Sequence, residues 1–362
     1  MKTSLNRDSL ADAVAWTAHA LTTRPAVPVL SGLLLEAGDS GLTVSAYDYD
    51  TSRQARTSAD VLHPGQLLLP GRVLVEVAKA LPKGKPVELV ADESEAVLTC
   101  GAAEFRLPTL PVEDYPTLPV TPPAIGTVDA AAFSSAVAQV APATSRDETV
   151  PMLTGIRFDA TGDQLALAAT DRYRIAARTL PWTPHTTTRA MIPGRVLADI
   201  AKSLQPGDVT IGLGDGVAGF ESVGRTTTVR LLDDQFIDYR ARLADDWPIH
   251  ADVAVAPLIA AVKRVALVAD KNTAIRLTFR QGQVLVEAGG GDTGRGTEVL
   301  EAELSGGDIE IAFQSQFLLD GLVGIAGEQV RIHTTKPAKP ALLTEADDDP
   351  AFRYLVMALR LA

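Results

Sequence analysis

The sequence contains a single cysteine, Cys100, among its 362 residues, which excludes a disulfide within the chain. No apolar run reaches the roughly 20 residues that a membrane-spanning helix needs, and the first ten residues lack the apolar core of a secretion signal. With 46% hydrophobic residues, the chain still has enough apolar surface for about two to three globular domains, which excludes disordered and collagen-like classes. We therefore expect a cytoplasmic protein with no membrane partner, in which Cys100 is a buried structural thiol.

Catalytic and metal-binding motifs are also absent. None of the five histidines stands at metal-ligand spacing from another histidine or from the cysteine. No P-loop, GxSxG elbow or dinucleotide-binding glycine motif is present. The glycine run Gly289–Gly291 precedes Asp292 in a polar stretch, which indicates a loop rather than a phosphate cradle. We expect no catalytic residue, no metal and no cofactor, and a binding or scaffolding role, with an enzyme of unrecognised type as the alternative.

Basic residues are fewer than acidic ones, and the formal net charge is −12. If that charge were evenly spread it would argue against nucleic acid as a partner, because affinity for phosphate comes mainly from Lys and Arg. The spread is uneven: residues 69–85 carry a local charge of +3 and residues 257–271 one of +2. The sequence therefore permits one basic inner surface on an otherwise acidic protein.

The chain repeats itself at an offset of 123 residues. Val29–Leu33 (VLSGL) matches Met152–Ile156 (MLTGI), and Leu69–Leu74 (LPGRVL) matches Ile192–Leu197 (IPGRVL) at that offset. A third, fainter copy follows the second by about 120 residues. Prolines gather near the two joints. The sequence therefore predicts three domains, 1–121, 122–249 and 250–362.

Three aspartates, Asp48, Asp50 and Asp171, could suggest paired carboxylates for acid-base chemistry. Ala46–Asp48 recurs as Ala169–Asp171 at the same offset and at the end of an expected strand. Recurrence at strand ends favours turn formation instead.

Within one repeat, hydrophobic periodicity predicts a helix near residues 10–21, strands over 33–37 and 42–46, a second helix from 71 to 82, and strands over 87–90 and 96–100. The same order recurs in each third of the chain. This predicts an α+β fold, with helices on one face of antiparallel sheets.

The second helix of a repeat carries a polar stripe. Arg72, Glu76 and Lys79 are spaced four and three apart, and Arg195, Asp199 and Lys202 repeat the pattern. One interpretation is a solvated face with an i,i+4 ion pair. The other is a shared surface for DNA phosphates. The third copy reads Gln316, Asp320 and Val323, so that helix contributes less.

Four strings are more specific: Arg24–Pro25 with Val27–Gly32 (VPVLSG), Ala169–Ala176 (ATDRYRIA), Phe236–Tyr239 (FIDY) and Tyr354–Leu361 (YLVMALRL). The chain resembles the bacterial sliding clamp, the beta subunit of DNA polymerase III, along nearly its whole length. The strings are similar to that family's first-domain signature and to its T-D-x-x-R-[LI]-A, F-P-x-[YF] and Y-x-x-M-P-x-R-L segments.

The resemblance implies a three-domain DNA-clamp fold and a head-to-tail homodimer, a ring with helices lining the pore and sheets outside. Such a ring encircles duplex DNA without sequence specificity and gives the replicative polymerase its processivity. Arg24 matches a DNA-contacting residue of the family, and the stripe adds Arg72, Lys79, Arg195 and Lys202. By the same resemblance, the subunit contact would place Phe105 and Leu107 against the region of Leu267, although these are equally compatible with ordinary core positions.

The resemblance also implies a pocket between the second and third domains for short peptide motifs of DNA polymerase and clamp loader, and for a peptide antibiotic at the same place. Such a pocket needs an apolar floor and a few polar groups. The matching positions are Leu153, Thr170, Arg172, Tyr173, Arg174, Ile175, Ile237, Arg242, Leu355 and Met357. Leu153, Ile175 and Leu355 are also compatible with plain core packing.

This chain departs from the family pattern near that pocket. Ile237, Ala244 and Ala358 stand where the family usually has proline, and Arg242 where it is usually aliphatic. A guanidinium at an apolar site must be solvated or paired. We hypothesise that peptide or inhibitor binding is altered. A second clamp copy that gives antibiotic resistance, or a decoy that no longer loads on DNA, are the alternatives to the ordinary replicative clamp.

Overall fold

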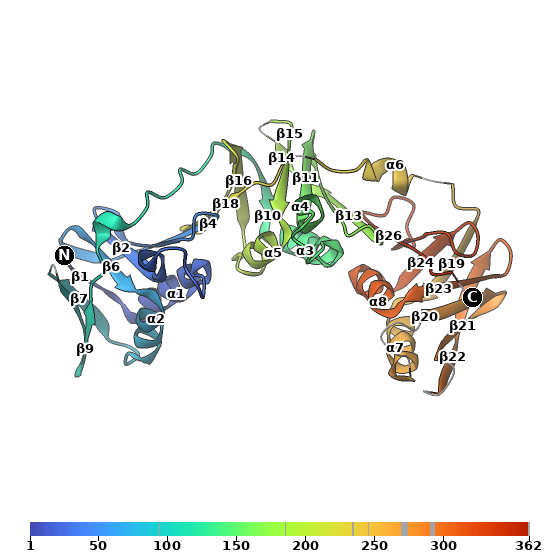
Figure 1. Cartoon of the computed structure of the whole chain (residues 1–362), viewed down its shortest axis with the longest axis horizontal. Coiled ribbons are helices and arrows are strands. Elements are labelled where there is room, and N and C mark those ends of the chain that lie inside the picture. Colours follow the sequence, from blue (N-terminus) through green and yellow to red (C-terminus); the bar gives the residue numbers. More distant parts are fainter. Residues whose placement is uncertain are drawn as a thin grey trace. The chain divides into compact units, whose positions relative to one another are not determined.

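The computed structural model describes residues 1–92, 94–184, 186–233, 235–244, 246–268, 274–289 and 294–360 (Figure 1). They form two compact units. Unit 1 comprises Met1–Ala130 and Ser203–Leu231, and unit 2 comprises Ala131–Lys202 and Leu232–Ala362. No helix in the described ranges is both long and apolar enough to cross a membrane.

Unit 1 consists of antiparallel sheets with two α-helices. One sheet has the order β5-β1-β7-β8-β9, and the other includes the run β10-β16-β17-β18-β4-β3-β2-β6. The helices are α1 (Arg7–Thr17) and α2 (Gly71–Ala80), with short 3-10 turns at Ala18–Ala20, Pro28–Ser31 and Val112–Asp114. The strands are β1 (Lys2–Asn6), β2 (Gly32–Gly38), β3 (Gly41–Tyr47), β4 (Thr51–Thr57), β5 (Asp60–His63), β6 (Gly65–Pro70), β7 (Pro86–Ala91), β8 (Glu95–Cys100), β9 (Ala103–Pro108), β10 (Ala124–Asp129), β16 (Asp208–Gly214), β17 (Val217–Ser222) and β18 (Arg225–Arg230).

The core of unit 1 lies where α1 and α2 meet the sheets. The side-chain oxygen of Asn6 accepts from the backbone N–H groups of Asp8 and Ser9, which fixes the start of α1. Leu10 of α1 and Leu74 of α2 are fully buried in one apolar cluster with strand residues. Cys100 belongs to the same cluster, so the expectation of a buried thiol is confirmed.

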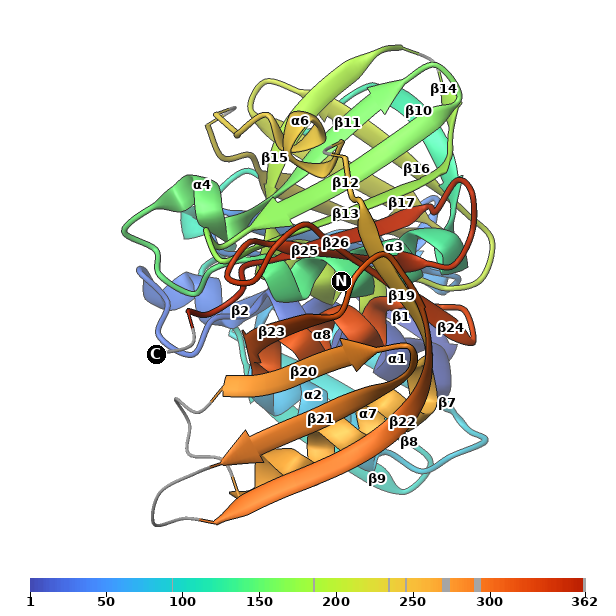
Figure 2. The same cartoon turned by 90° about the vertical axis from the view of Figure 1, so that its right-hand side faces the viewer.

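Unit 2 is built on one long antiparallel sheet with helices packed against it. Its strand order is β15-β11-β12-β13-β26-β25-β24-β19-β22-β21-β20-β23. Figure 2 shows α7 behind β21 and β22, and α8 packs against α7, β23 and β26. The helices are α3 (Ala130–Val140), α4 (Pro151–Thr154), α5 (Gly194–Lys202), α6 (Tyr239–Leu243), α7 (Val255–Val265) and α8 (Ser315–Gly324), with 3-10 turns at Ala141–Ala143 and Ala266–Val268. The strands are β11 (Gly155–Thr161), β12 (Gln164–Thr170), β13 (Arg174–Pro181), β14 (Thr183–Pro184), β15 (Thr188–Pro193), β19 (Ile249–Ala254), β20 (Ala274–Arg280), β21 (Gly282–Gly289), β22 (Arg295–Ser305), β23 (Ile309–Gln314), β24 (Gln329–Thr334), β25 (Ala341–Glu345) and β26 (Phe352–Val356).

The pairing of β13 with β26 joins the second sequence repeat to the third. The two strands run antiparallel, and Ile175 lies opposite Leu355 in their register. Because β26 is the last strand of the chain, this pair brings positions 180 residues apart to one place on the sheet. The joint positions the candidate site described below.

The repeat seen in the sequence recurs in the element order. A strand and helix open each third (β1-α1, β10-α3, β19-α7), and a second helix follows the next strands (α2, α5, α8). The predicted α+β class with antiparallel sheets is confirmed. The helix expected up to residue 21 ends instead at Thr17 and continues as a 3-10 turn, since short tightened turns are common at helix ends.

The expected aspartate turns are also confirmed. The side-chain oxygen Oδ1 of Asp48 accepts from Asp50 and Thr51 N–H groups, and that of Asp171 accepts from Tyr173 and Arg174 N–H groups. The residue after each aspartate has a positive φ, which is 77° at Tyr49 and 80° at Arg172.

Candidate peptide pocket and DNA-facing residues

The candidate pocket has an apolar floor on the β13–β26 pair. Ile175 and Leu355 are buried there in one cluster with Tyr239 and Leu243 of α6. Phe236 and Trp247 pack against this cluster from the segments on either side of α6. The short helix is therefore held on the sheet by its two buried residues.

Exposed apolar groups border this floor. Tyr173 is 60% exposed and stacks on the ring of Phe317, with 5.9 Å between ring centroids. Met357 is 44% exposed, and its backbone N–H donates to the backbone oxygen of Tyr173 at 2.8 Å. Ile237 is also exposed, just before α6. Exposed apolar groups that gather in one place commonly mark a binding surface.

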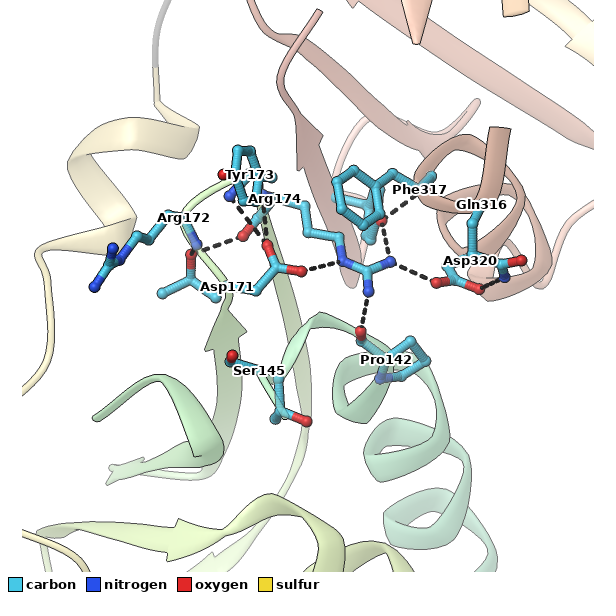
Figure 3. A network of polar contacts seen from close by, with 12 residues as sticks. Pro142, Ser145, Asp171, Arg172, Tyr173, Arg174, Gln316, Phe317 and Asp320 are labelled. Atoms are coloured by element: carbon cyan, nitrogen blue, oxygen red, sulfur yellow. Dashed lines mark hydrogen bonds and ion pairs between the residues drawn. The ribbon is translucent and has the colours of Figure 1, made fainter. Parts of the chain in front are cut away.

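Arg174, in contrast, is buried, and every nitrogen of its guanidinium donates a hydrogen bond within the fold (Figure 3). Its Nε donates to Asp171 at 2.8 Å, and its Nη1 donates to Asp320 and to the Tyr354 hydroxyl. Its Nη2 donates to the backbone oxygen of Pro142. These bonds hold the Arg174 side chain inside the fold, beneath the candidate pocket residues of the same turn.

The turn before β13 fixes the neighbouring candidates. The Thr170 hydroxyl donates to the Arg174 backbone oxygen at 2.7 Å and accepts from the Arg172 N–H at 3.2 Å. Thr170 is buried, whereas Arg172 is exposed. Of these two side chains, only that of Arg172 is exposed and able to contact a ligand.

The remaining pocket candidates lie on α4 and α6. Leu153 of α4 is buried, and its backbone oxygen accepts from the Ser145 N–H at 2.7 Å. Arg242 of α6 is exposed, so the guanidinium that the sequence placed at an apolar position is solvated.

A cavity of about 850 Å³ lies beside α6, and no sequence pattern pointed to it. Asp159 lies in its wall, accepts from the Tyr239 hydroxyl at 3.3 Å and pairs with Arg240 at 3.4 Å. Burial, together with the charge of Asp159, raises the pKa of Tyr239 to about 12. The small side chains of Ala166, Ala177, Ala244 and Ala351 leave the space open.

All five candidate DNA contacts are exposed. Arg72 and Lys79 lie on α2, and Arg195 and Lys202 lie on α5, while Arg24 precedes the 3-10 turn at Pro28–Ser31. The ion pair of the first stripe joins Lys79 to Glu76 at 3.6 Å, an i,i+3 rather than i,i+4 contact. In the third copy, Asp320 is not a free stripe residue, because it accepts from Arg174.

The candidate interface residues differ in exposure. Leu267 is 84% exposed, Phe105 is half-buried against the core of unit 1, and Leu107 belongs to that core. The Leu107 side chain is therefore packed within unit 1 and is not exposed to contact a second subunit.

Gly290–Asp292 and His185 lie outside the described residues. In the part of the chain that the structure describes, no three His, Cys, Asp or Glu side chains are placed to hold a metal ion.

The chain is similar to known proteins over its whole length. Residues 1–119, 127–238 and 245–360 match the N-terminal, central and C-terminal domains of the DNA polymerase III beta subunit. The beta sliding clamp of Streptomyces coelicolor is 44% identical, with both chains covered completely. The beta sliding clamp homolog GriR of Streptomyces muensis is 38% identical, with 99% of each chain covered.

Solved structures agree with this similarity. A sliding clamp from Pseudomonas aeruginosa bound to griselimycin superposes with a TM-score of 0.94 at 26% identity, with complete coverage of both chains. The sliding clamp from Bacillus subtilis, at 24% identity and a TM-score of 0.95, has the same fold. The chain belongs to the DNA polymerase III beta subunit family, the bacterial sliding clamps.

Proposed function

We propose that two copies of this sliding clamp close head to tail into a ring around duplex DNA and hold the replicative polymerase there through a peptide pocket on unit 2. The chain is a non-catalytic processivity clamp, with DNA and DNA polymerase as its partners. What we add is the homodimer, the residues at each contact, the domain bounds 1–121, 122–249 and 250–362, and the cytoplasm as the compartment.

The observation that carries the ring proposal is a pair of open strand edges. Among the described residues, β9 pairs only with β8, and residues 295–302 of β22 pair only with β21. Open edges can pair with a strand of another chain. Because one edge lies in the first repeat and the other in the third, such a contact is head-to-tail, and head-to-tail contacts form a ring when the rotation closes. Phe105 on β9 and Leu267 after α7 then add apolar contact.

Leu267→Glu tests this interface. A buried carboxylate without a partner is costly, so we expect sedimentation to show a shift from dimer to monomer. Leu62→Glu is the matched control, since Leu62 is 61% exposed on β5, at the opposite edge of the same sheet as β9. A dimer that survives Leu267→Glu contradicts the proposed contact.

Encirclement has its own test. The wild-type protein is loaded by a clamp loader onto a nicked circular plasmid, and the plasmid is then cut once. A ring held by topology leaves the linear DNA within minutes, whereas a clamp bound by surface affinity stays. Retention after cutting would reject the topological link.

The DNA surface that we propose consists of Arg24, Arg72, Lys79, Arg195 and Lys202. Their exposure and their recurrence on α2 and α5 support this assignment. Phosphate contacts by Lys and Arg are independent of sequence, which suits a protein that must slide.

The peptide pocket that we propose uses Ile175, Leu355, Tyr173, Ile237 and Met357 as apolar contacts. Arg172 and Arg242 stand at its border, and Leu153, Thr170 and Arg174 support it. A buried floor with exposed apolar groups beside it fits a short peptide with apolar anchors. A fluorescent clamp-binding peptide from a DNA polymerase should bind the dimer saturably. Ile175→Asp should abolish binding while the dimer remains.

A specialised second copy with resistance to a clamp-directed antibiotic is the alternative. Three exposed residues near this pocket differ from the family pattern: Ile237, Arg242 and Ala244. The Pseudomonas aeruginosa relative is bound to griselimycin in its solved structure. Titration of griselimycin and of the polymerase peptide against this clamp and the Streptomyces coelicolor clamp decides the question. Weaker griselimycin binding with unchanged peptide binding favours resistance, and equal binding of both ligands rejects it.

A further inference from the structure

Two arginines border the apolar floor of the pocket without a partner in the fold. Arg172 and Arg242 are both exposed, and neither makes an ion pair or a side-chain hydrogen bond within the described part of the chain. Other arginines of unit 2 do pair, such as Arg157 with Asp159 and Arg331 with Asp252.

The backbone fixes the origin of the Arg172 side chain. Its φ of 80° is a conformation that non-glycine residues rarely adopt. The turn is held by two hydrogen bonds, from the Tyr173 and Arg174 N–H groups to Asp171. Figure 3 shows the Arg172 side chain pointing away from the Arg174 network. Its guanidinium is therefore presented from a rigid turn and not drawn into the fold.

Helix geometry places Arg242 on one flank of α6. Tyr239 and Leu243 are buried on the sheet, so they define the inward face of the helix. At about 100° per residue, Arg240 projects from one flank and Arg242 from the other. Arg240 lines the cavity of about 850 Å³ and pairs with Asp159, whereas Arg242 does not line that cavity. Arg242 therefore lies on the flank opposite the cavity.

Three carboxylates close in sequence to the two arginines are already engaged. Asp171 pairs with Arg174 at 2.8 Å, and Asp238 caps α6 by accepting from the Ala241 N–H at 3.2 Å. Asp147 accepts from the Thr149 hydroxyl at 2.6 Å and from its N–H at 3.0 Å. These bonds hold the pKa of Asp147 below its usual range, with a smaller contribution from the charge of Arg172. None of these three carboxylates makes an ion pair with Arg172 or Arg242, so both guanidiniums are open to a carboxylate of a ligand.

We propose that Arg172 and Arg242 select partner peptides that carry Asp or Glu beside their apolar anchors. The inference rests on the proposed peptide pocket and deepens it. Guanidinium groups bind carboxylates through charge-assisted hydrogen bonds, often in bidentate geometry. An exposed pair contributes little by itself, so we expect the two arginines together to give about a 5-fold preference for an acidic over a neutral peptide.

Three versions of one fluorescent polymerase-derived peptide test this, with the residues beside the apolar anchors changed to Asp, Ser or Lys. Anisotropy titrations at 50 and 300 mM NaCl should rank the affinities as acidic, then neutral, then basic. The spread should shrink at the higher salt, because exposed charges are screened. Arg172→Ala and Arg242→Ala should each reduce the preference, and the double variant should remove it while the neutral peptide still binds.

Arg240→Gln is the matched control. It removes the same charge from the same helix but on the cavity side, so the preference for the acidic peptide should persist. If Arg240→Gln lowers the preference as much as Arg242→Ala does, the preference comes from general charge attraction and the proposed recognition by Arg242 is wrong. Equal binding of the Asp and Ser peptides to the wild type overturns the inference and leaves the pocket intact. Failure of all three peptides to bind the intact dimer overturns the pocket as well.

Discussion

The guanidinium of Arg174 lies over the ring of Phe317, with 4.4 Å from its central carbon to the ring centroid. Arg174 belongs to the second repeat and Phe317 to the third. The Tyr354 hydroxyl links the same two residues, because it accepts from Arg174 and donates to the Phe317 backbone oxygen at 2.8 Å. One side chain thus ties α8 to the β13–β26 pair, next to the proposed peptide pocket.

Arg174→Ala should destabilise the protein strongly. The change leaves Asp171 and Asp320 without their guanidinium partner, and breaking a buried ion pair costs about 3 kcal/mol or more. Arg174→Lys should recover part of that loss, since an ammonium cannot supply all four hydrogen bonds. Urea unfolding measures the free energy. Arg276→Ala, at an exposed pair with Glu310, is the control and should cost under about 1 kcal/mol. A similar small loss at Arg174 would show that the network adds little stability.

Arg172→Gly should give a more stable protein than Arg172→Ala, by about 1 kcal/mol. The φ of 80° strains any residue with a Cβ atom, and glycine removes that strain. Thermal and urea unfolding of the two variants compare the free energies directly, with the guanidinium absent from both. If alanine is the more stable of the two, the turn is not strained at this position.

His333 should make the protein less stable in mild acid. Burial, together with the charges of the neighbouring His250 and Arg331, lowers the pKa of His333 from 6.5 to about 4. The fold therefore favours the neutral ring. Its contribution to the free energy of unfolding is complete above pH 6.5 and is lost as the pH falls toward 4.

His333→Gln cannot take up that proton, and it keeps a polar group near the Thr344 hydroxyl, which lies 3.1 Å from His333 Nε2. Its unfolding midpoint in urea should fall less steeply than that of the wild type between pH 6.5 and 4. Parallel profiles for the two proteins would assign the acid sensitivity to other groups.

Lys79→Ala combined with Lys202→Ala should weaken DNA binding by the dimer at low salt. Each phosphate contact that is removed lowers the slope of log affinity against log salt by about 1. Asp199→Asn is the opposite change on the stripe of α5, and it should strengthen binding. Electrophoretic mobility shifts at several salt concentrations measure both effects. Unchanged slopes in the lysine variant would remove these helices from the DNA surface.

Features that depend on short-range pattern could be predicted from the residues alone. The repeat at 123 residues, the order of helices and strands, the polar stripes of α2 and α5, and the turns at Asp48 and Asp171 all follow from local spacing. Local spacing sets which side chains share a helix face and which backbone groups an aspartate can reach. These features were therefore predictable without knowledge of the fold.

Tertiary structure alone decided which candidates are exposed and which are engaged. Arg172 and Arg174 stand two residues apart in one string, yet the first is exposed and the second is buried among acceptors from the second and third repeats. Leu107 and Leu267 matched the same predicted interface, but only Leu267 is on the surface. The burial and ion pairing of Arg174 depend on β26 and α8, which lie more than 140 residues further along the chain. Contacts of that range leave no periodic trace in the sequence, because packing rather than spacing determines them.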